Sequence, residues 1–295
     1  MADAVGNKAV KDFHLDVPAP DQGFFVKGLG NTDWGLKNRL SRIFSPKSGR
    51  TVMLAFDHGY FMGSTAGLER IDVSIAPLAD HADVLMGTRG AIRSCIPPTA
   101  DRAICLRATH DNSVLFDDLS QGSGFALDME DAIRMNASAL AIQCFIGAKG
   151  ERDSLEALCR AVDQGNRYGI PIMGVTAVGK EMARTTKYFL LATRILAEQG
   201  ASIIKTYFCE DFEKVVAACP VPIVIAGGKK LPEDEALTMA YQAVQSGACG
   251  VDMGRNIFQS EYPIEMCEAV RKVVHEGFND KEAFEFFQEA TKAGK

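Results

Sequence analysis

The chain has 295 residues, of which 47% are hydrophobic and 24% are charged, a balance typical of a globular protein and not of a disordered one. Asp and Glu (38) outnumber Lys and Arg (32), so the formal net charge is −6, which disfavours a nucleic-acid or anionic-membrane partner. The length fits either two ordinary domains or one α/β barrel of about 250 residues.

The eight cysteines are scattered and form no C-x-x-C pair. Several lie in apolar runs, as Cys144 does, which predicts buried thiols in a reducing compartment and neither disulfides nor zinc ligands. Residues 1–22 lack the apolar segment of a signal peptide, and no stretch reaches the roughly 18 apolar residues that span a bilayer. We therefore expect a cytoplasmic protein with no membrane partner.

Residues 1–50 are rich in Gly, Pro and charge and contain one expected helix, which begins at Trp34. Leu36, Leu40 and Ile43 recur in it near helical spacing. We expect these three side chains, together with Trp34, to form the buried side of an extension that covers the rest of the protein or joins subunits.

From Thr51 onward, short apolar runs alternate with polar turns and helical patterns. Runs that are apolar on both faces are typical of strands in a parallel sheet covered on both sides. Eight such runs begin at Val52, Val84, Ala103, Ala139, Ile172, Ile203, Ile223 and Gly250. Helical windows fall between them, as over residues 154–168, 188–198 and 232–245, so the connections are βαβ crossovers.

Eight such units predict a TIM (β/α)8 barrel over residues 51–276, with an N-terminal extension (1–50) and a C-terminal helix (277–295). The alternative fold is an open doubly wound sheet. That fold usually has fewer strands and a phosphate loop after the first one. Here the corresponding loop, residues 57–59, has no Gly-x-Gly-x-x-Gly pattern.

In a TIM barrel the active site lies at the carboxyl ends of the strands. The sharpest candidate there is Lys205, which ends the apolar run at residues 202–207. A desolvated amine is more readily present as the free base, the form that attacks a ketone to give a Schiff base. The alternative is a lysine that forms an ordinary salt bridge or extends to water at the barrel mouth.

Asp57 and His58 end the first strand, where an adjacent carboxylate and imidazole can serve in acid–base catalysis. Since neighbours in a strand point to opposite faces, only Asp57, in phase with Met53 and Ala55, faces the barrel axis unless the chain has already turned. The alternative is that Asp57 caps a turn and His58 packs locally.

Glycines follow the last two strands, at Gly227 and Gly228 and again at Gly254, which precedes Arg255. Backbone N–H groups at such positions approach an anion closely, and TIM barrels often bind phosphate there. We expect these four residues to bind phosphate, the alternative being two plain tight turns.

Two further cations are candidate substrate contacts. Arg107 ends the third strand, where it binds a substrate anion or balances an acid, and Lys229 follows Gly228, where it contacts substrate or remains solvated. Lys180, in the loop after the fifth strand, lies near the barrel mouth but is expected to be solvated. The five histidines show no His-x-His or His-x-x-x-His spacing, so we expect no metal site.

A strand-borne lysine, an acid on the first strand and a phosphate site indicate carbon–carbon bond chemistry on a phosphorylated ketone through an iminium. Four segments also resemble the class I aldolase family of archaeal fructose-bisphosphate aldolase and deoxyribose-phosphate aldolase: residues 55–59, 203–207, 222–230 and 250–259. The resemblance implies that Lys205 forms the Schiff base and that Asp57 is its acid–base or electrostatic partner. It also implies that the phosphate is bound by Gly227, Gly228, Gly254 and Arg255.

Residues 32–35 and 39–44 resemble in particular a member of this family that transfers an acetyl group from a phosphorylated diketone to coenzyme A. That resemblance implies dihydroxyacetone phosphate and acetyl-CoA as products, coenzyme A as co-substrate and no cofactor. It also implies a homo-oligomer, such as a decamer of two rings. No motif in the sequence indicates where coenzyme A binds.

One departure from the family bears on the chemistry. Archaeal aldolases carry a tyrosine proton donor near the fifth strand, whereas residues 174–180 here contain no aromatic hydroxyl. This disfavours fructose-bisphosphate aldolase activity and leaves proton transfer to Asp57, His58 or a water. The alternatives are a Schiff-base aldolase for another phosphorylated sugar, a decarboxylase or isomerase barrel without a covalent adduct, and a non-catalytic sugar-phosphate binding barrel.

Overall fold

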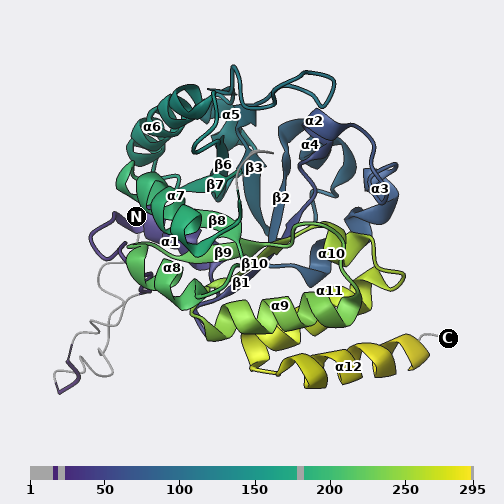
Figure 1. Ribbon diagram of the computed structural model, residues 1–295. Helices are drawn as coiled ribbons and strands as arrows, with labels where there is room; N and C mark the ends of the chain where they lie inside the picture. Colours follow the sequence, from purple (N-terminus) through teal and green to yellow (C-terminus); the bar gives the residue numbers. More distant parts are fainter. Residues whose placement is uncertain (1–15, 19–23, 178–182, 294–295) are drawn as a thin grey trace, which may run out of the picture.

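The computed structural model describes residues 16–18, 24–177 and 183–293, and its centre is a closed barrel of eight parallel strands (Figure 1). The strands follow chain order around the barrel, and the last pairs in parallel with the first, with Thr51 opposite Gly250. In order they are β1 (Thr51–Ala55), β2 (Val84–Thr88), β3 (Ala103–Arg107), β6 (Ala139–Cys144), β7 (Ile172–Thr176), β8 (Ile203–Tyr207), β9 (Ile223–Ala226) and β10 (Gly250–Met253). This closure confirms the predicted TIM barrel and excludes the open sheet.

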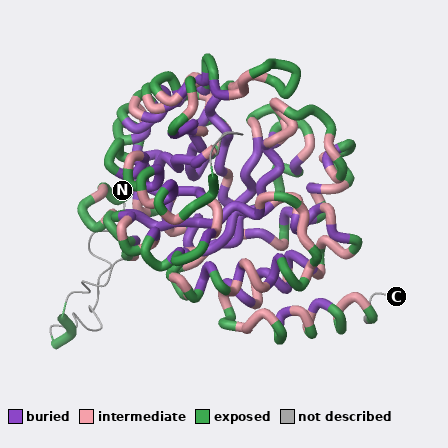
Figure 2. The backbone as a smooth tube through the Cα atoms, in the orientation of Figure 1, coloured by how far each residue is buried: buried purple, intermediate pink, exposed green. Residues whose placement is uncertain are grey.

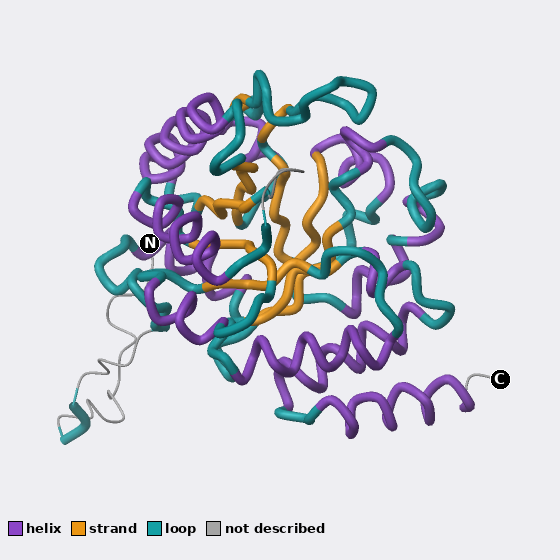
Figure 3. Tube along the Cα trace, viewed as in Figure 1, coloured by secondary structure: helices purple, strands orange, loops and turns teal. Residues whose placement is uncertain are grey.

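Helices surround the barrel between the strands (Figure 3). Those between β1 and β10 are α2 (Gly59–Met62), α3 (Ile71–Ser74), the 3-10 helix η1 (Ala76–His81), α4 (Arg89–Cys95), α5 (Met129–Arg134), α6 (Glu151–Tyr168), α7 (Thr186–Glu198), α8 (Phe212–Ala218) and α9 (Glu233–Gln245). After β10 come α10 (Arg255–Phe258), α11 (Pro263–Arg271), the π-helical turn η2 (Lys272–Glu276) and α12 (Asp280–Ala293), which packs on α9 and α11. The three predicted helical windows coincide with α6, α7 and α9.

Between β3 and β6 the chain adds a short antiparallel pair, β4 (Thr109–His110) and β5 (Gly124–Phe125), which the sequence patterns did not predict. Two residues per strand are too few to produce a recognisable alternation of apolar and polar side chains. The pair contacts β6 and α6 outside the barrel wall.

The strands are apolar on both faces because the barrel separates two cores, and Figure 2 shows the barrel strands as almost continuously buried. Alternate residues face outward against the helices, as Val52 and Leu54 of β1 do. Their neighbours fill the barrel interior, and the interior set includes Met53, Val84, Met86, Cys105, Ala141, Met173, Ile203 and Val224. Burying each large side chain of this kind contributes about 1.5–3 kcal/mol to folding.

Helix α1 (Trp34–Ile43) closes the amino-terminal end of the barrel. Leu36, Leu40 and Ile43 are buried and join the interior core, as predicted. Trp34, however, is 79% exposed in the single chain, so it does not pack on the barrel as the other three side chains do, and burial of Trp34 between subunits stays a prediction. Successive helical residues rotate by about 100°, so position 34 lies roughly opposite position 36 on the helix.

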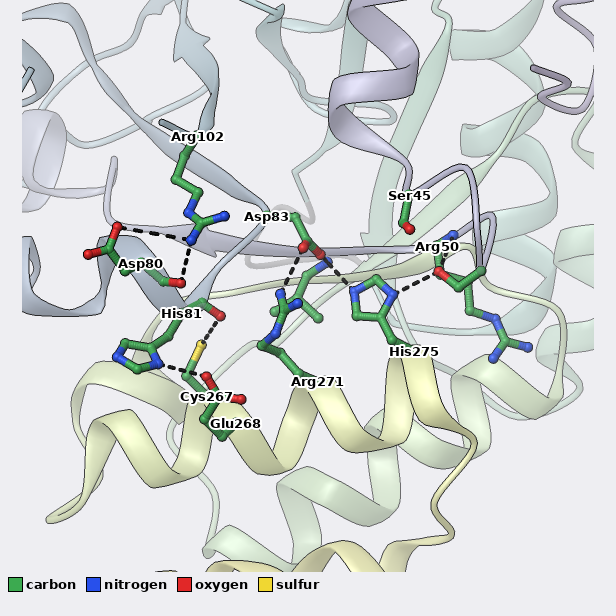
Figure 4. A network of polar contacts seen from close by, with 12 residues as sticks. Ser45, Arg50, Asp80, His81, Asp83, Arg102, Cys267, Glu268, Arg271 and His275 are labelled. Carbon is green, nitrogen blue, oxygen red and sulfur yellow. Dashed lines mark hydrogen bonds and ion pairs between the residues drawn. The ribbon is translucent and has the colours of Figure 1, made fainter. Parts of the chain in front are cut away.

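A polar network at this same end joins the last part of the barrel to its first two strands (Figure 4). Asp83, just before β2, accepts hydrogen bonds from the backbone N–H of Val52 (2.7 Å) and from Arg271 Nη1 (2.7 Å). Its Oδ2 also lies 2.8 Å from Nε2 of His275, whose Nδ1 is hydrogen-bonded to Ser48 Oγ at 2.8 Å. Burial opposes the charge on Asp83, but the hydrogen bonds from His275 and Arg271 outweigh it and lower the pKa of this carboxyl.

We predict that Asp83→Asn lowers the free energy of unfolding at pH 7 by about 2–3 kcal/mol, because charge-assisted hydrogen bonds at a largely buried site are lost. A group whose pKa is lowered on folding stabilises the protein above its unfolded pKa, about 3.9 for Asp, and loses this effect as pH falls. The difference between wild type and variant should therefore shrink below about pH 4. Urea unfolding measured across pH tests this.

The control for this experiment is Asp72→Asn, which removes an exposed carboxylate whose ion pair is with the exposed Arg70. We expect no measurable change in unfolding for the control. An unchanged Asp83→Asn curve at pH 7 would contradict the assigned role of the network.

Candidate active site

A cavity of about 150 Å³ opens at the carboxyl ends of the strands, where the sequence analysis placed the active site. Residues from seven of the eight strands or the loops that follow them line it: Ala55, Asp57, His58, Phe61, Met62, Arg107, Gln143, Val175, Lys205, Tyr207, Ala226, Gly227, Gly228, Asp252, Gly254 and Arg255. The structure thus brings together eight of the nine predicted site residues. The ninth, Lys229, is exposed and does not line the cavity.

Lys205 extends from β8 into this cavity and is buried. It follows Ile203, which faces the barrel interior, in the strand alternation, so its amine also points inward. The Nζ atom lies 2.9 Å from Oδ2 of Asp252 on β10 and 3.5 Å from Sδ of Met86 on β2. The amine is thus shielded from bulk water and in contact with a carboxylate.

Asp57 and Arg107 form a second buried ion pair in the cavity. Arg107 donates from Nε (2.6 Å) and Nη2 (2.5 Å) to the same oxygen, Oδ2 of Asp57. Burial alone would raise the pKa of Asp57, but the charges of Arg107 and Lys205 outweigh it and lower that pKa. Asp57 is therefore a fixed carboxylate near neutral pH, which suits an electrostatic role better than that of a proton donor.

The other nitrogen of this guanidinium has no partner. Arg107 Nη1 is buried and makes no hydrogen bond within the part of the chain that the structure describes. Buried donors are rarely left unpaired, because the loss of hydration costs about 1–3 kcal/mol. Since Arg107 lines the cavity, its Nη1 group is a donor available to a substrate oxygen.

His58 also reaches the cavity, although strand alternation alone placed it on the opposite side from Asp57. The chain has already turned here: His58 has helical dihedral angles (φ −67°, ψ −11°) and immediately precedes α2. Its Nε2 is hydrogen-bonded to Thr65 Oγ1 at 3.1 Å, and its ring stacks on Phe258. Burial, with help from Arg255, lowers the pKa of His58, so the neutral imidazole is favoured at pH 7.

The loops after β9 and β10 lie together on one side of the cavity. Asn256 connects them, since its Nδ2 donates to Gly227 O (2.8 Å) and its Oδ1 accepts from Leu231 N–H (2.8 Å). A side chain at Gly254 would place its Cβ 2.1 Å from Ala55 O, so this position requires glycine. Gly228 adopts φ +69°, in the left-handed region. No sequence pattern indicates that Asn256 holds the two glycine turns together.

Tyr207 supplies an aromatic hydroxyl to the cavity that the sequence analysis sought only near the fifth strand. It lies two residues after Lys205 on β8 and therefore on the same face. The guanidinium of Arg184 stacks over its ring, 3.9 Å from the ring centroid. Lys180, predicted near the mouth, lies outside the described residues.

Asp252 and Gln143 are further cavity residues that the sequence analysis missed. The detectable signal was a charged residue, Asp252, inside an otherwise apolar run. Burial raises the pKa of Asp252 despite the neighbouring Lys205, in contrast to Asp57. Two carboxyl groups near one lysine therefore have pKa values shifted in opposite directions, an arrangement that separates a proton carrier from a permanent anion.

Cys105 faces the barrel interior, where burial raises its thiol pKa and disfavours the nucleophilic thiolate. Across residues 24–177 and 183–293, no three His, Cys, Asp or Glu side chains gather into a group that could hold a metal ion. None of the described helices has the length and apolar character needed to cross a membrane.

Comparisons with known proteins show the family and the fold of this chain. Residues 51–260, more than half of the chain, match the DeoC/LacD family aldolase model. A 3-hydroxy-5-phosphonooxypentane-2,4-dione thiolase of Enterobacter sp. (strain 638) is 57% identical to this chain over 290 residues, which cover 98% of each chain. The enzyme of the same name from Photorhabdus laumondii is 57% identical over 288 residues, which cover 97% of this chain and 98% of the relative. Among solved structures, an archaeal fructose 1,6-bisphosphate aldolase superposes with a TM-score of 0.73 at 23% identity, covering 82% of this chain and 100% of that one.

The chain therefore belongs to the DeoC/LacD aldolase family. Several relatives that match nearly the whole length carry the thiolase name, and the solved aldolase shares its barrel fold.

We predict that Arg107→Met destabilises the protein by about 3–5 kcal/mol, because it leaves the Asp57 carboxylate buried without a partner. The double variant Asp57→Asn/Arg107→Met should lose about 1–3 kcal/mol less free energy of unfolding than the two single variants lose together. The reason is that neither side of the pair then retains an unpaired charge. Urea unfolding of the four proteins measures this coupling.

A matched cycle on the exposed helical pair Arg160 and Glu156 should give a coupling within error of zero. Strict additivity of the Asp57 and Arg107 variants would contradict the buried ion pair.

Proposed function

We propose that this protein transfers an acetyl group from 3-hydroxy-5-phosphonooxypentane-2,4-dione to coenzyme A, giving dihydroxyacetone phosphate and acetyl-CoA in autoinducer-2 breakdown. The observation that carries the proposal is the buried Lys205 amine, which shares one cavity with two carboxylates and with the glycine turns beside Arg255. The names of relatives 57% identical to this chain support the choice of substrate.

In the proposed reaction, the Lys205 amine attacks the ketone next to the phosphorylated carbon, and loss of water gives an iminium. The coenzyme A thiolate then adds to the acetyl carbonyl. When that adduct collapses, the bond between the acetyl carbon and the hydroxylated carbon breaks, and its electron pair moves into the iminium to give an enamine. Protonation of the enamine carbon and hydrolysis release dihydroxyacetone phosphate and restore the lysine.

The cavity offers a group for each charge in this sequence. Arg255 and the backbone N–H groups of Gly227, Gly228 and Gly254 would bind the phosphate, which fixes the ketone relative to Lys205. The unpartnered Nη1 of Arg107 would donate to an oxygen that gains negative charge during thiolate addition. The fixed negative charge of Asp57 would stabilise the cationic iminium.

We also propose a cytoplasmic homo-oligomer, such as a decamer. Support comes from large apolar side chains on the surface of the described chain, among them Leu115 (92% exposed), Trp34 (79%) and Phe25 (75%). Contiguous exposed apolar groups are typical of protein interfaces, and Leu115 lies between the exposed Val114 and Phe116.

We predict that borohydride reduction with dihydroxyacetone phosphate traps a covalent adduct on Lys205, located by peptide mass spectrometry. Lys205→Ala should form no adduct and show no detectable turnover, since the nucleophile is gone. The control Lys214→Ala, at an exposed lysine paired with Asp211, should behave as wild type. An adduct on another lysine, or none, would overturn the mechanism.

The same preparation distinguishes thiolase from aldolase. Acetyl-CoA should appear only when the phosphorylated diketone and coenzyme A are both supplied. Cleavage of another phosphorylated sugar without coenzyme A, and no acetyl-CoA, would instead establish a Schiff-base aldolase. An adduct without any turnover would indicate a sugar-phosphate binding barrel.

We predict that Arg255→Ala raises KM for the phosphorylated diketone about 10- to 100-fold with a smaller change in kcat, because charge-assisted hydrogen bonds to phosphate contribute about 1.5–3 kcal/mol. Lys229→Ala is the matched control, since that side chain is exposed and lies outside the cavity lining, and its KM should change less than twofold. Equal effects of the two variants would contradict the phosphate site.

A further inference from the structure

Asp252 is an unusual carboxylate for the interior of a barrel. It lies within β10, its side chain is fully buried, and it belongs to the same cavity as Lys205. Apart from the 2.9 Å contact between its Oδ2 and Lys205 Nζ, neither oxygen accepts a hydrogen bond from a residue that the structure describes. Buried carboxylates are ordinarily held by several donors, so this one is not placed for stability alone.

Asp57 provides the contrast within the same cavity. Its Oδ2 receives two N–H groups of Arg107, a partner that does not give up its proton. Among the described residues, the polar partner of Asp252 is an amine, which can exchange a proton with it. The pKa of Asp57 is lowered and that of Asp252 is raised, in accord with this difference in partners.

We propose that Asp252 is the acid–base catalyst of Schiff-base formation at Lys205, an inference that rests on the proposed lysine mechanism. The Asp252 carboxylate first takes a proton from the Lys205 ammonium, which frees the amine's electron pair. The amine then forms the bond to the ketone carbon, and the amine's second proton moves to the ketone oxygen to give a neutral carbinolamine. Asp252 returns its proton to that hydroxyl, the C–O bond breaks, and water leaves as the iminium forms.

Charge is conserved in this sequence: an ammonium and a carboxylate are present at the start, and an iminium and a carboxylate at the end. Tyr207 also lines the cavity, but among the described residues no hydrogen bond joins its hydroxyl to Lys205, and two other groups nearby have partners of their own. His58 Nε2 is hydrogen-bonded to Thr65, and the Tyr60 hydroxyl is hydrogen-bonded to Asp111. Asp252 is the carboxyl group that directly contacts the reacting nitrogen.

The test compares Asp252→Asn with wild type in the rate of borohydride-trapped adduct formation with dihydroxyacetone phosphate at pH 7. Asn has the same shape but does not carry the proton, so we expect a decrease of about 100-fold or more. Binding of glycerol 3-phosphate, which has the phosphate but no ketone, should change less than threefold by calorimetry. The control Thr206→Val, next to Lys205 on β8 with a buried, unpartnered hydroxyl, should trap adduct within twofold of the wild-type rate.

A second variant, Asp252→Ala, keeps the proposal testable if the Asn variant does not fold. Added formate should restore adduct formation in Asp252→Ala by at least tenfold, whereas chloride at the same concentration should not. Wild-type trapping rates in either variant would overturn the assignment of Asp252 but not the lysine mechanism. Loss of adduct together with loss of glycerol 3-phosphate binding would do the same. Absence of any adduct in the wild type would overturn the lysine mechanism as well.

Discussion

Two ion pairs buried at one end of a closed barrel govern the structure of the candidate site. Charges cost several kcal/mol each to remove from water, so they persist there only when they are paired. Both pairs meet this requirement: Lys205 pairs with Asp252, and Arg107 pairs with Asp57. The four partners come from β8, β10, β3 and the end of β1. The barrel must therefore close with the correct register for the pairs to form, and the pairs in turn hold the reactive groups in fixed positions.

The pairs differ in what they permit. The Arg107 guanidinium stays charged at any relevant pH, so Asp57 is a permanent anion. The Lys205 amine can lose a proton, and its partner Asp252 can accept one. One cavity thus contains both a fixed electrostatic partner for an iminium and a carboxyl group able to transfer protons, while Arg255 and the glycine turns lie where a phosphate would hold the substrate.

The two ends of the barrel have separate tasks. At the amino-terminal end, Leu36, Leu40 and Ile43 of α1 fill the opening, and Asp83 connects the helical segment after β10 to the first two strands (Figure 4). At the carboxyl end, loops bring polar groups to the cavity. This division matches the general behaviour of TIM barrels, in which stability and chemistry are located at opposite ends.

The eight strands, the main crossover helices and most residues of the candidate site could be predicted from the sequence, because apolar periodicity and turn residues are local and strand ends of a parallel barrel converge at one edge. Lys205, Asp57 and the two glycine turns could be found for that reason. Three features required the folded structure: Trp34 lies on the surface of the chain, Lys229 lies outside the cavity lining, and Asp252 contacts Lys205. These outcomes depend on which face each segment turns inward and on the register between distant strands, and neither is encoded by any short stretch of residues.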